Sequence, residues 1–214
     1  MSNYVRPAVP VQTFRDADGA LIEYGGRWGS QGPPEGSYSV DSHPERFAPL
    51  HQIADALIDH LQRTYDVEVS DDLSCVQDLR HPMDAVRAVR LTPVAADAAP
   101  LTFVFTSYPG VVVHAGLLQD FAYPRCGCDA CDESLSSVAD ELERHVQAVV
   151  SGRYREEVRG NGDAPWIWYE LRAADGSPNG GSGTDATHEA GTELQAAAAR
   201  LESLPDGWAA WSHR

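Results

Sequence analysis

The longest stretch without a charged residue, 98–119, restricts the fold of this chain more than any other feature of the sequence. Its length approaches that of a membrane-spanning helix, yet Ser107–Gly110 places Ser-Tyr-Pro-Gly near its centre. Such a turn inside a bilayer would leave backbone hydrogen-bonding groups without partners. The runs Leu101–Phe105 and Val111–Val113 on either side are rich in β-branched and aromatic residues, which favour strands. We therefore predict a buried β-hairpin.

The segments around this hairpin predict an α+β fold. A strand before it completes an antiparallel β-meander over about 85–118, with strands at 85–93, 101–107 and 111–118. Apolar residues at three- and four-residue spacing predict helices over about 44–65, 134–150 and 192–203. Shorter runs predict a hairpin of 11–15 with 20–24, and a late strand over 166–171.

The chain of 214 residues is long enough to bury one core without disulfide bonds. Its strands cluster together and are flanked by helices, so we expect a single α+β domain over 1–214. Glycine, proline and serine are frequent around 25–39, and glycine, serine and threonine around 174–191. We expect flexible loops in both places.

The charge of the chain narrows the classes of function. Its 32 acidic and 16 basic residues give a net charge of -16, and every basic residue is arginine. Without lysine, Schiff-base chemistry and a Walker-type phosphate loop are excluded. The negative charge disfavours nucleic acid and membrane surfaces as partners, so a protein or small molecule of basic or neutral character is expected. The sequence does not distinguish a monomer from a dimer.

Residues 1–11 contain one arginine and two prolines and lack the apolar segment of a secretory signal. We therefore expect a cytoplasmic protein. In that compartment four cysteines do not indicate a disulfide framework.

Three of the cysteines, Cys126, Cys128 and Cys131, fall in one short loop between a predicted strand and a predicted helix. Thiolates are preferred ligands of zinc, and a glycine between the first two lets the loop turn its sulfur atoms toward one centre. Zinc takes four ligands, so we predict Cys75 as the fourth. His114, His81 and His43 are the alternatives for that position. The predicted function is a non-enzymatic binding protein stabilised by structural zinc.

Other functions fit parts of the same pattern. Cys128 and Cys131 form a C-x-x-C motif, which is also found in thiol-disulfide redox proteins. His43 and Glu45 form an H-x-E motif that, with the cysteine loop, partly matches the signature of zinc-dependent nucleobase deaminases. The acidity alone also fits an immunity protein that neutralises a basic toxin.

Aromatic and histidine side chains outside the loop have simpler interpretations. Trp166 and Trp168 alternate on the late strand, so we expect both on one core-facing side. We expect Trp208 and Trp211 in the C-terminal tail to pack back on the domain, because tryptophan buries a large apolar area. We expect His145 to be solvated.

Three longer segments together resemble a family of uncharacterised actinobacterial proteins. They are Ser42–His51 before the first long helix, Tyr108–Gly116 in the hairpin, and Cys126–Asp132 in the cysteine loop. The resemblance extends from about Tyr24 to the C-terminal tail. Because the family has no assigned activity, it implies no catalytic residue.

Overall fold

The computed structural model describes residues 4–10, 12–81, 83–161, 164–186 and 191–214. The described helices are α1 (Pro49–Thr64), α2 (Leu135–Val150) and α3 (Gly191–Glu202), with 3-10 turns η1 (Glu35–Ser37), η2 (Pro44–Phe47) and η3 (Leu73–Asp78). All strand pairs described are antiparallel, so the α+β prediction is confirmed.

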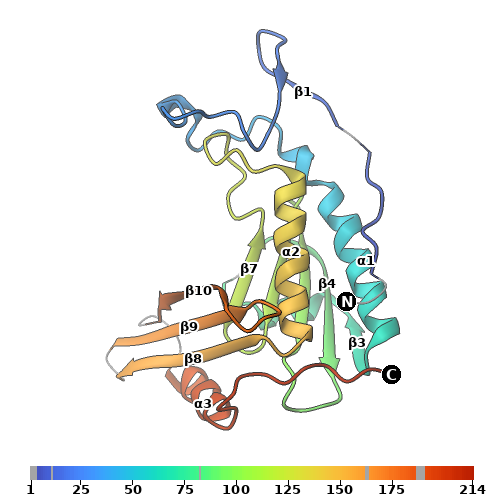
Figure 1. Ribbon diagram of the computed structural model, residues 1–214, viewed down its shortest axis with the longest axis vertical. Coiled ribbons are helices and arrows are strands. Elements are labelled where there is room, and N and C mark those ends of the chain that lie inside the picture. Colours follow the sequence, from blue (N-terminus) through green and yellow to red (C-terminus); the bar gives the residue numbers. More distant parts are fainter. Residues whose placement is uncertain (1–3, 11, 82, 162–163, 187–190) are drawn as a thin grey trace.

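A five-stranded meander forms the centre of the molecule (Figure 1). Its strands in order are β3 (Val67–Asp71), β4 (Ala85–Pro93), β5 (Leu101–Thr106), β6 (Val111–Ala115) and β7 (Gln119–Tyr123). The predicted hairpin is β5 and β6, which are joined at Ser107–Gly110. The edge strands β3 and β7 were not predicted, because only Val67 of β3 is buried and no apolar alternation marks it.

The two faces of the meander support different structures. Val89, Phe103, Val113 and Phe121 lie side by side across four strands and face the main core, to which α1 and α2 contribute. On the opposite face, η3 covers a smaller apolar cluster that includes Ala88, Val104 and Val112. The two long helices therefore share one side of the sheet (Figure 1).

The predicted helices are present with small differences. The helix expected from about 44 is interrupted, because Pro49 has no backbone N–H to continue the hydrogen-bond ladder from η2 into α1. Ser134 begins α2 by accepting a hydrogen bond from the backbone N–H of Ser137 through its side chain. The short hairpin is β1 (Phe14–Arg15) with β2 (Leu21–Ile22).

A second sheet has the order β10 (Pro178–Asp185), β9 (Ala164–Arg172) and β8 (Tyr154–Asn161). The prediction of a flexible loop over 174–191 was wrong for Pro178–Asp185, which pairs with β9 along its length. Glycine is required there because a Cβ atom at Gly183 would overlap the indole of Trp166. Glycine, which indicated a loop in the sequence, thus leaves space for a tryptophan ring in a strand.

The tryptophan predictions had different outcomes. Trp208 and Trp211 are each 3% exposed, so the packing of the tail is confirmed. Trp166 is 43% exposed, and the core side of β9 carries Ile167 and Leu171 instead. The expectation that Trp166 and Trp168 face the core was therefore wrong. Among the residues described, no helix combines the length and apolarity needed to cross a bilayer.

Candidate metal centre

The cysteine loop lies between the end of β7 at Tyr123 and the start of α2. Its three Sγ atoms all lie within 4.8 Å of one another. The Sγ atoms of Cys126 and Cys128 are 3.2 Å apart. Cys128 is buried, Cys126 is partly buried and Cys131 is exposed, so the group of sulfur atoms reaches from the interior to the surface.

Gly127 sits between the first two cysteines for a packing reason. A Cβ atom at this position would overlap the hydroxyl group of Tyr108, which lies against the loop. Asp132, directly after Cys131, has a left-handed backbone with φ of 54°. Its side chain accepts a hydrogen bond from the backbone N–H of Arg27, 2.8 Å away. The loop therefore turns sharply and is fixed at the turn by a distant segment.

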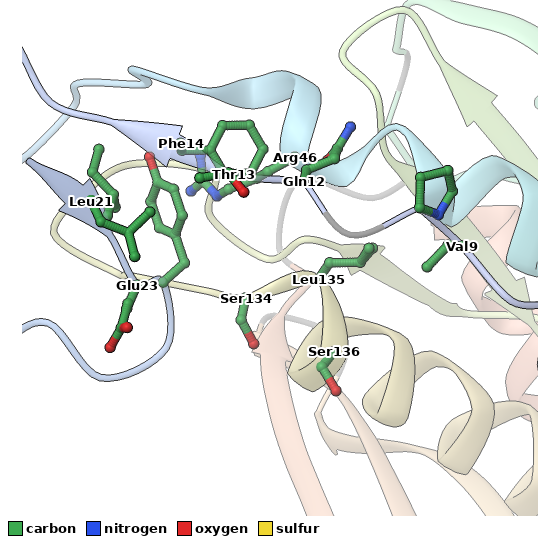
Figure 2. A pocket seen from close by; sticks show the side chains of 13 residues that line it. Val9, Gln12, Thr13, Phe14, Leu21, Glu23, Arg46, Ser134, Leu135 and Ser136 are labelled. Carbon is green, nitrogen blue, oxygen red and sulfur yellow. The ribbon is translucent and has the colours of Figure 1, made fainter. Parts of the chain in front are cut away.

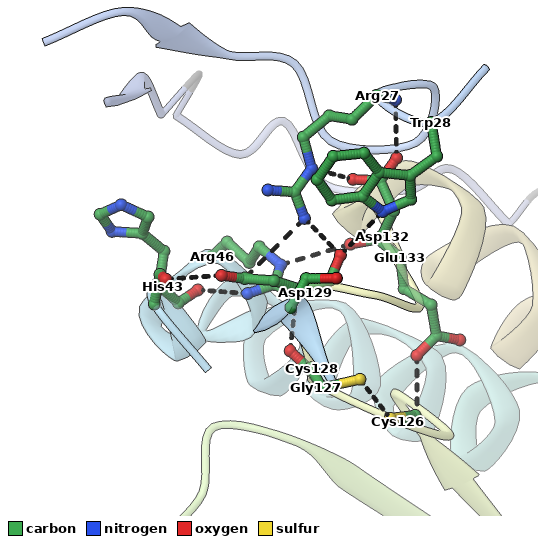
Figure 3. Close-up of polar contacts among 12 residues, drawn as sticks. Arg27, Trp28, His43, Arg46, Cys126, Gly127, Cys128, Asp129, Asp132 and Glu133 are labelled. Carbon is green, nitrogen blue, oxygen red and sulfur yellow. Dashed lines mark hydrogen bonds and ion pairs between the residues drawn. The ribbon is translucent and has the colours of Figure 1, made fainter. Parts of the chain in front are cut away.

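That distant segment, residues 25–48, wraps around the cysteine loop (Figure 3). Backbone N–H groups of Asp129 and Ala130 donate to the carbonyl oxygens of Val40 and Ser37. The indole of Trp28 donates to the Asp129 carbonyl oxygen at 3.0 Å. These contacts hold the backbone in place without using the sulfur atoms.

Arg46 is the most deeply buried cation near the loop, at 2% exposure. Its guanidinium donates to the carbonyl oxygens of Gly127 at 2.7 Å, His43 at 2.8 Å and Glu133 at 3.3 Å. It also lies over the ring of Tyr24, 4.1 Å from the centroid. Among the described residues no carboxylate forms an ion pair with it, so its charge is solvated by carbonyl dipoles and an aromatic ring.

Arg46 also lines a mostly apolar cavity of about 460 Å³ (Figure 2). Its walls include Val9, Phe14 and Leu21 from the N-terminal segment and Leu135 from the first turn of α2. A cavity of this size accommodates a small organic molecule. One side of the guanidinium thus touches the cysteine loop while another borders a space large enough for a ligand.

The close sulfur atoms change the acidity of one another. The pKa of the Cys128 thiol is lowered, because the side chain of Cys126 and the backbone N–H of Cys131 stabilise its thiolate. The pKa of Cys131 is raised, because its thiol is hydrogen-bonded to Cys126 and Cys128. Burial raises the pKa of Glu133, which accepts a hydrogen bond from the backbone N–H of Cys126 at 2.9 Å. The thiol of Cys128 is therefore the more acidic and that of Cys131 the less acidic of this pair.

With this geometry in place, comparison with known families gives one result. The sequence model of a family of unknown function, DUF6226, matches residues 10–214. The chain belongs to this family. No curated protein and no solved structure matches the chain.

The prediction of an uncharacterised family is therefore confirmed, and the family assigns no activity to the chain. The match also extends over the N-terminal hairpin, beyond the region of the predicted resemblance.

The structure does not bring the fourth predicted ligand to the other three. Cys75 lies on η3, within the small apolar cluster on the face of the meander opposite α1 and α2. Its Sγ atom is 3.6 Å from the hydroxyl oxygen of Ser70. Spacing along the chain could not reveal this separation, because it depends on how η3 packs against the meander.

The three histidines predicted as alternative fourth ligands also lie outside the sulfur group. His114 has its Nδ1 atom 2.6 Å from a carboxylate oxygen of Asp120. Both ring nitrogens of His43 are engaged, with Glu45 at 3.0 Å and the carbonyl oxygen of Arg15 at 3.1 Å. Figure 3 shows the ring of His43 turned away from the sulfur atoms of Cys126 and Cys128. His81 is exposed, and among the described residues only the three loop cysteines form a possible metal group.

The functional residues that the sequence did not indicate are those that hold the cysteine loop in place, above all Arg46 and Arg27. Arg27 lies in an expected loop and Arg46 at the start of an expected helix. Neither a loop composition nor a helical periodicity indicates a contact with residues about 80 to 105 positions away. The burial of a single arginine is not revealed by the spacing of apolar residues around it. Chemically, the site offers three sulfur donors that can hold a metal ion.

Proposed function

We propose that Cys126, Cys128 and Cys131 bind one zinc ion, and that the protein is a non-enzymatic binding protein whose cysteine loop is stabilised by that ion. The proposal is carried by the three Sγ atoms that lie within 4.8 Å of one another. Zinc–sulfur bonds of about 2.3 Å in a tetrahedron place sulfur atoms about 3.8 Å apart. Small side-chain rotations would bring the Cys126–Cys128 pair from 3.2 Å to that separation.

Arg46 supports this proposal electrostatically. Three thiolates around Zn²⁺ leave a net charge of about -1. A buried cation is costly unless an opposite charge or good hydrogen bonds compensate it. Arg46 is bound to the carbonyl oxygen of Gly127, between two of the ligands, so its positive charge would offset the negative charge of the thiolate-bound ion.

Metal analysis of the purified full chain tests the zinc site. We expect about one zinc per chain in the unchanged protein, and loss of that zinc in Cys128→Ser. Cys75→Ser is the matched control, because Cys75 lies in the apolar cluster under η3 and should leave the zinc content unchanged. An unchanged protein without stoichiometric zinc would contradict the proposal.

Removal of the metal gives an independent readout. The free energy of binding a structural ion adds to the free energy of unfolding, so a chelator should lower the melting temperature by on the order of 10 °C. Cys128→Ser, which lacks the site, should show no further decrease on chelation. Equal melting temperatures of the unchanged protein with and without chelator would show that no ion stabilises the fold.

Thiol-disulfide redox activity is the second candidate, favoured by the sulfur atoms of Cys128 and Cys131, which lie within 4.8 Å of each other. The two candidates differ in how metal affects alkylation. Redox activity requires Cys128 and Cys131 to react with an alkylating agent whether or not metal is present. Protection by zinc would favour the metal site, and equal reactivity would favour the redox protein.

A deaminase-like zinc hydrolase has less support. Its signature requires a histidine ligand and a nearby glutamate, but His43 and Glu45 hydrogen-bond to each other instead of joining the sulfur group. Non-catalytic binding remains our proposal, with a cytoplasmic location.

For the partner we propose a protein or small molecule of basic or neutral character, because the chain carries a charge of -16. An immunity protein that neutralises a basic toxin is one form of this proposal. Association with such a toxin would weaken as salt concentration rises.

A further inference from the structure

The zinc proposal leaves one coordination position to be filled. A tetrahedral ion takes four donors, and the loop supplies three. Within the described ranges no other cysteine, histidine, aspartate or glutamate atom joins the sulfur group. The fourth donor therefore has to come from outside the set of side chains that the fold brings together.

The carboxylates closest in sequence have other roles. Glu133 accepts the backbone N–H of Cys126, Asp129 accepts the hydroxyl of Ser42 at 2.5 Å, and Asp132 is paired with Arg27. Each of these contacts shapes the loop, and none of the three carboxylates lies within the sulfur group.

The sulfur group is open to solvent on one side. Cys131 is exposed, whereas Cys128 is buried beneath the segment 25–48. An ion held by all three would have its inner side covered by protein and its outer side reachable from solution. This is the arrangement of metal sites that keep one exchangeable position.

The chemistry of the three donors selects the ligand that would enter. A zinc ion that already carries three thiolates is a soft, electron-rich centre, and soft centres prefer sulfur over oxygen. Its reduced positive charge also makes it a weak acidifier of bound water, in contrast to zinc held by neutral histidines. A further thiolate adds negative charge, which the buried guanidinium of Arg46 behind Gly127 offsets.

We propose that the metal ion of this loop binds an external thiol at its fourth position. This inference rests on the proposed metal site and specifies the ligand it takes. A thiol replaces water on the ion: the metal–oxygen bond breaks, a metal–sulfur bond forms, and the thiol proton passes to the released water. No electron is transferred. The thiol comes from a small molecule or from a cysteine of a partner protein.

Cobalt substitution of the full chain tests the proposal, because sulfur-to-cobalt charge-transfer absorption grows with the number of bound thiolates. The protein is kept reduced with a phosphine, which adds no sulfur ligand. The cobalt protein should show absorption for three thiolates, and saturating 2-mercaptoethanol should raise it by about one third as a fourth thiolate binds. Ethanol, the matched oxygen donor, should leave it unchanged.

The source of the thiol is distinguished by a second pair of probes. A short peptide with one cysteine is compared with the same peptide carrying serine. Tighter binding of the cysteine peptide than of 2-mercaptoethanol indicates a protein partner, and the reverse indicates a small molecule; either result supports the external thiol.

Three results of the cobalt experiment would each contradict a different part of the proposal. No cobalt absorption at all would overturn the metal site itself. Absorption that 2-mercaptoethanol does not change would overturn the external thiol while leaving the metal site intact. A loss of about one quarter of the absorption in Cys75→Ser would show that Cys75 is the fourth ligand after all.

Discussion

His145 lies on α2 with its Nδ1 atom 2.5 Å from the hydroxyl oxygen of Tyr123, and only 7% of the residue is exposed. The sequence placed it beside the apolar residues of α2, and we expected it to be solvated. That expectation was wrong, because β7 and Phe121 cover this flank of the helix. Burial lowers the pKa of His145 to about 4, with further lowering by Arg144 and Arg125.

This shift predicts a pH dependence of stability. Between about pH 6.5 and 4 the unfolded chain binds a proton at His145 that the folded chain does not, so the free energy of unfolding falls as pH decreases. The loss attributable to this residue should reach about 3 kcal/mol at pH 4.

Denaturant unfolding of His145→Gln over the same pH range measures this contribution. Glutamine can still accept the hydrogen bond from Tyr123, so the variant should remain folded. Its stability should fall less steeply with decreasing pH than that of the unchanged protein. Parallel curves for the two proteins would show that His145 is not the residue responsible.

Arg46, like His145, is a polar residue whose burial the sequence did not indicate. The printed sequence marks it as an ordinary charged residue at a helix start, where a solvated side chain is common. In the structure it is among the largest fully buried side chains, and it reaches the carbonyl oxygen of Gly127, 81 residues later. Only the folded arrangement identifies it as a support of the cysteine loop.

At the scale of elements, the connection from the cysteine loop to α2 combines a local signal with a distant one. Ser134 caps the helix, and such a cap is readable from sequence. The turn before it is held by Arg27 through Asp132, which no local pattern indicates. The helix start was therefore predicted well, whereas the anchoring of the loop was not.

We predict that Ser134→Ala lowers the free energy of unfolding by about 1 kcal/mol, because the backbone N–H of Ser137 in the first turn loses the side-chain oxygen that accepts its hydrogen bond. Ser136→Ala, in the same turn, is the control: Ser136 is exposed, and alanine favours the helix. Its stability should be unchanged or slightly higher. Equal losses in the two variants, measured by denaturant unfolding, would exclude a capping role for Ser134.

Strands β8 and β10 show where element prediction fails. The charged sequence of β8 and the glycine-rich sequence of β10 have little strand propensity. Both pair with β9, whose apolar and aromatic residues were recognised as a strand. Pairing with a strong neighbour supplies the backbone hydrogen bonds that local preference does not.

At the scale of the whole molecule, the C-terminal tail ties the two sheets together. The indole of Trp208 donates to the buried carboxylate of Glu156 on β8 at 2.9 Å. The indole of Trp211 donates to the carbonyl oxygen of Ala99, just before β5, at 2.9 Å. Burial raises the pKa of Glu156, although Leu117 and Leu118 also donate backbone N–H groups to it. The tail is therefore part of the core.

We predict that Trp208→Ala and Trp211→Ala each lower the free energy of unfolding by about 3–5 kcal/mol, because each removes a large buried side chain and a hydrogen bond. Trp166→Ala is the matched control, since Trp166 on β9 is 43% exposed. It should cost about 1 kcal/mol or less. Comparable losses for all three tryptophans would contradict the role of the tail.

The sequence by itself determined the elements whose signal is local: the β5–β6 hairpin, the long helices α1 and α2, and three cysteines close enough along the chain to meet. Periodicity and short spacing specify such features because neighbouring residues share a face or a turn. Only the tertiary structure decided that Cys75 lies in the apolar cluster under η3, apart from the other cysteines, and that Arg46 supports the cysteine loop. Those relations depend on how distant segments pack, and packing leaves no period in the sequence.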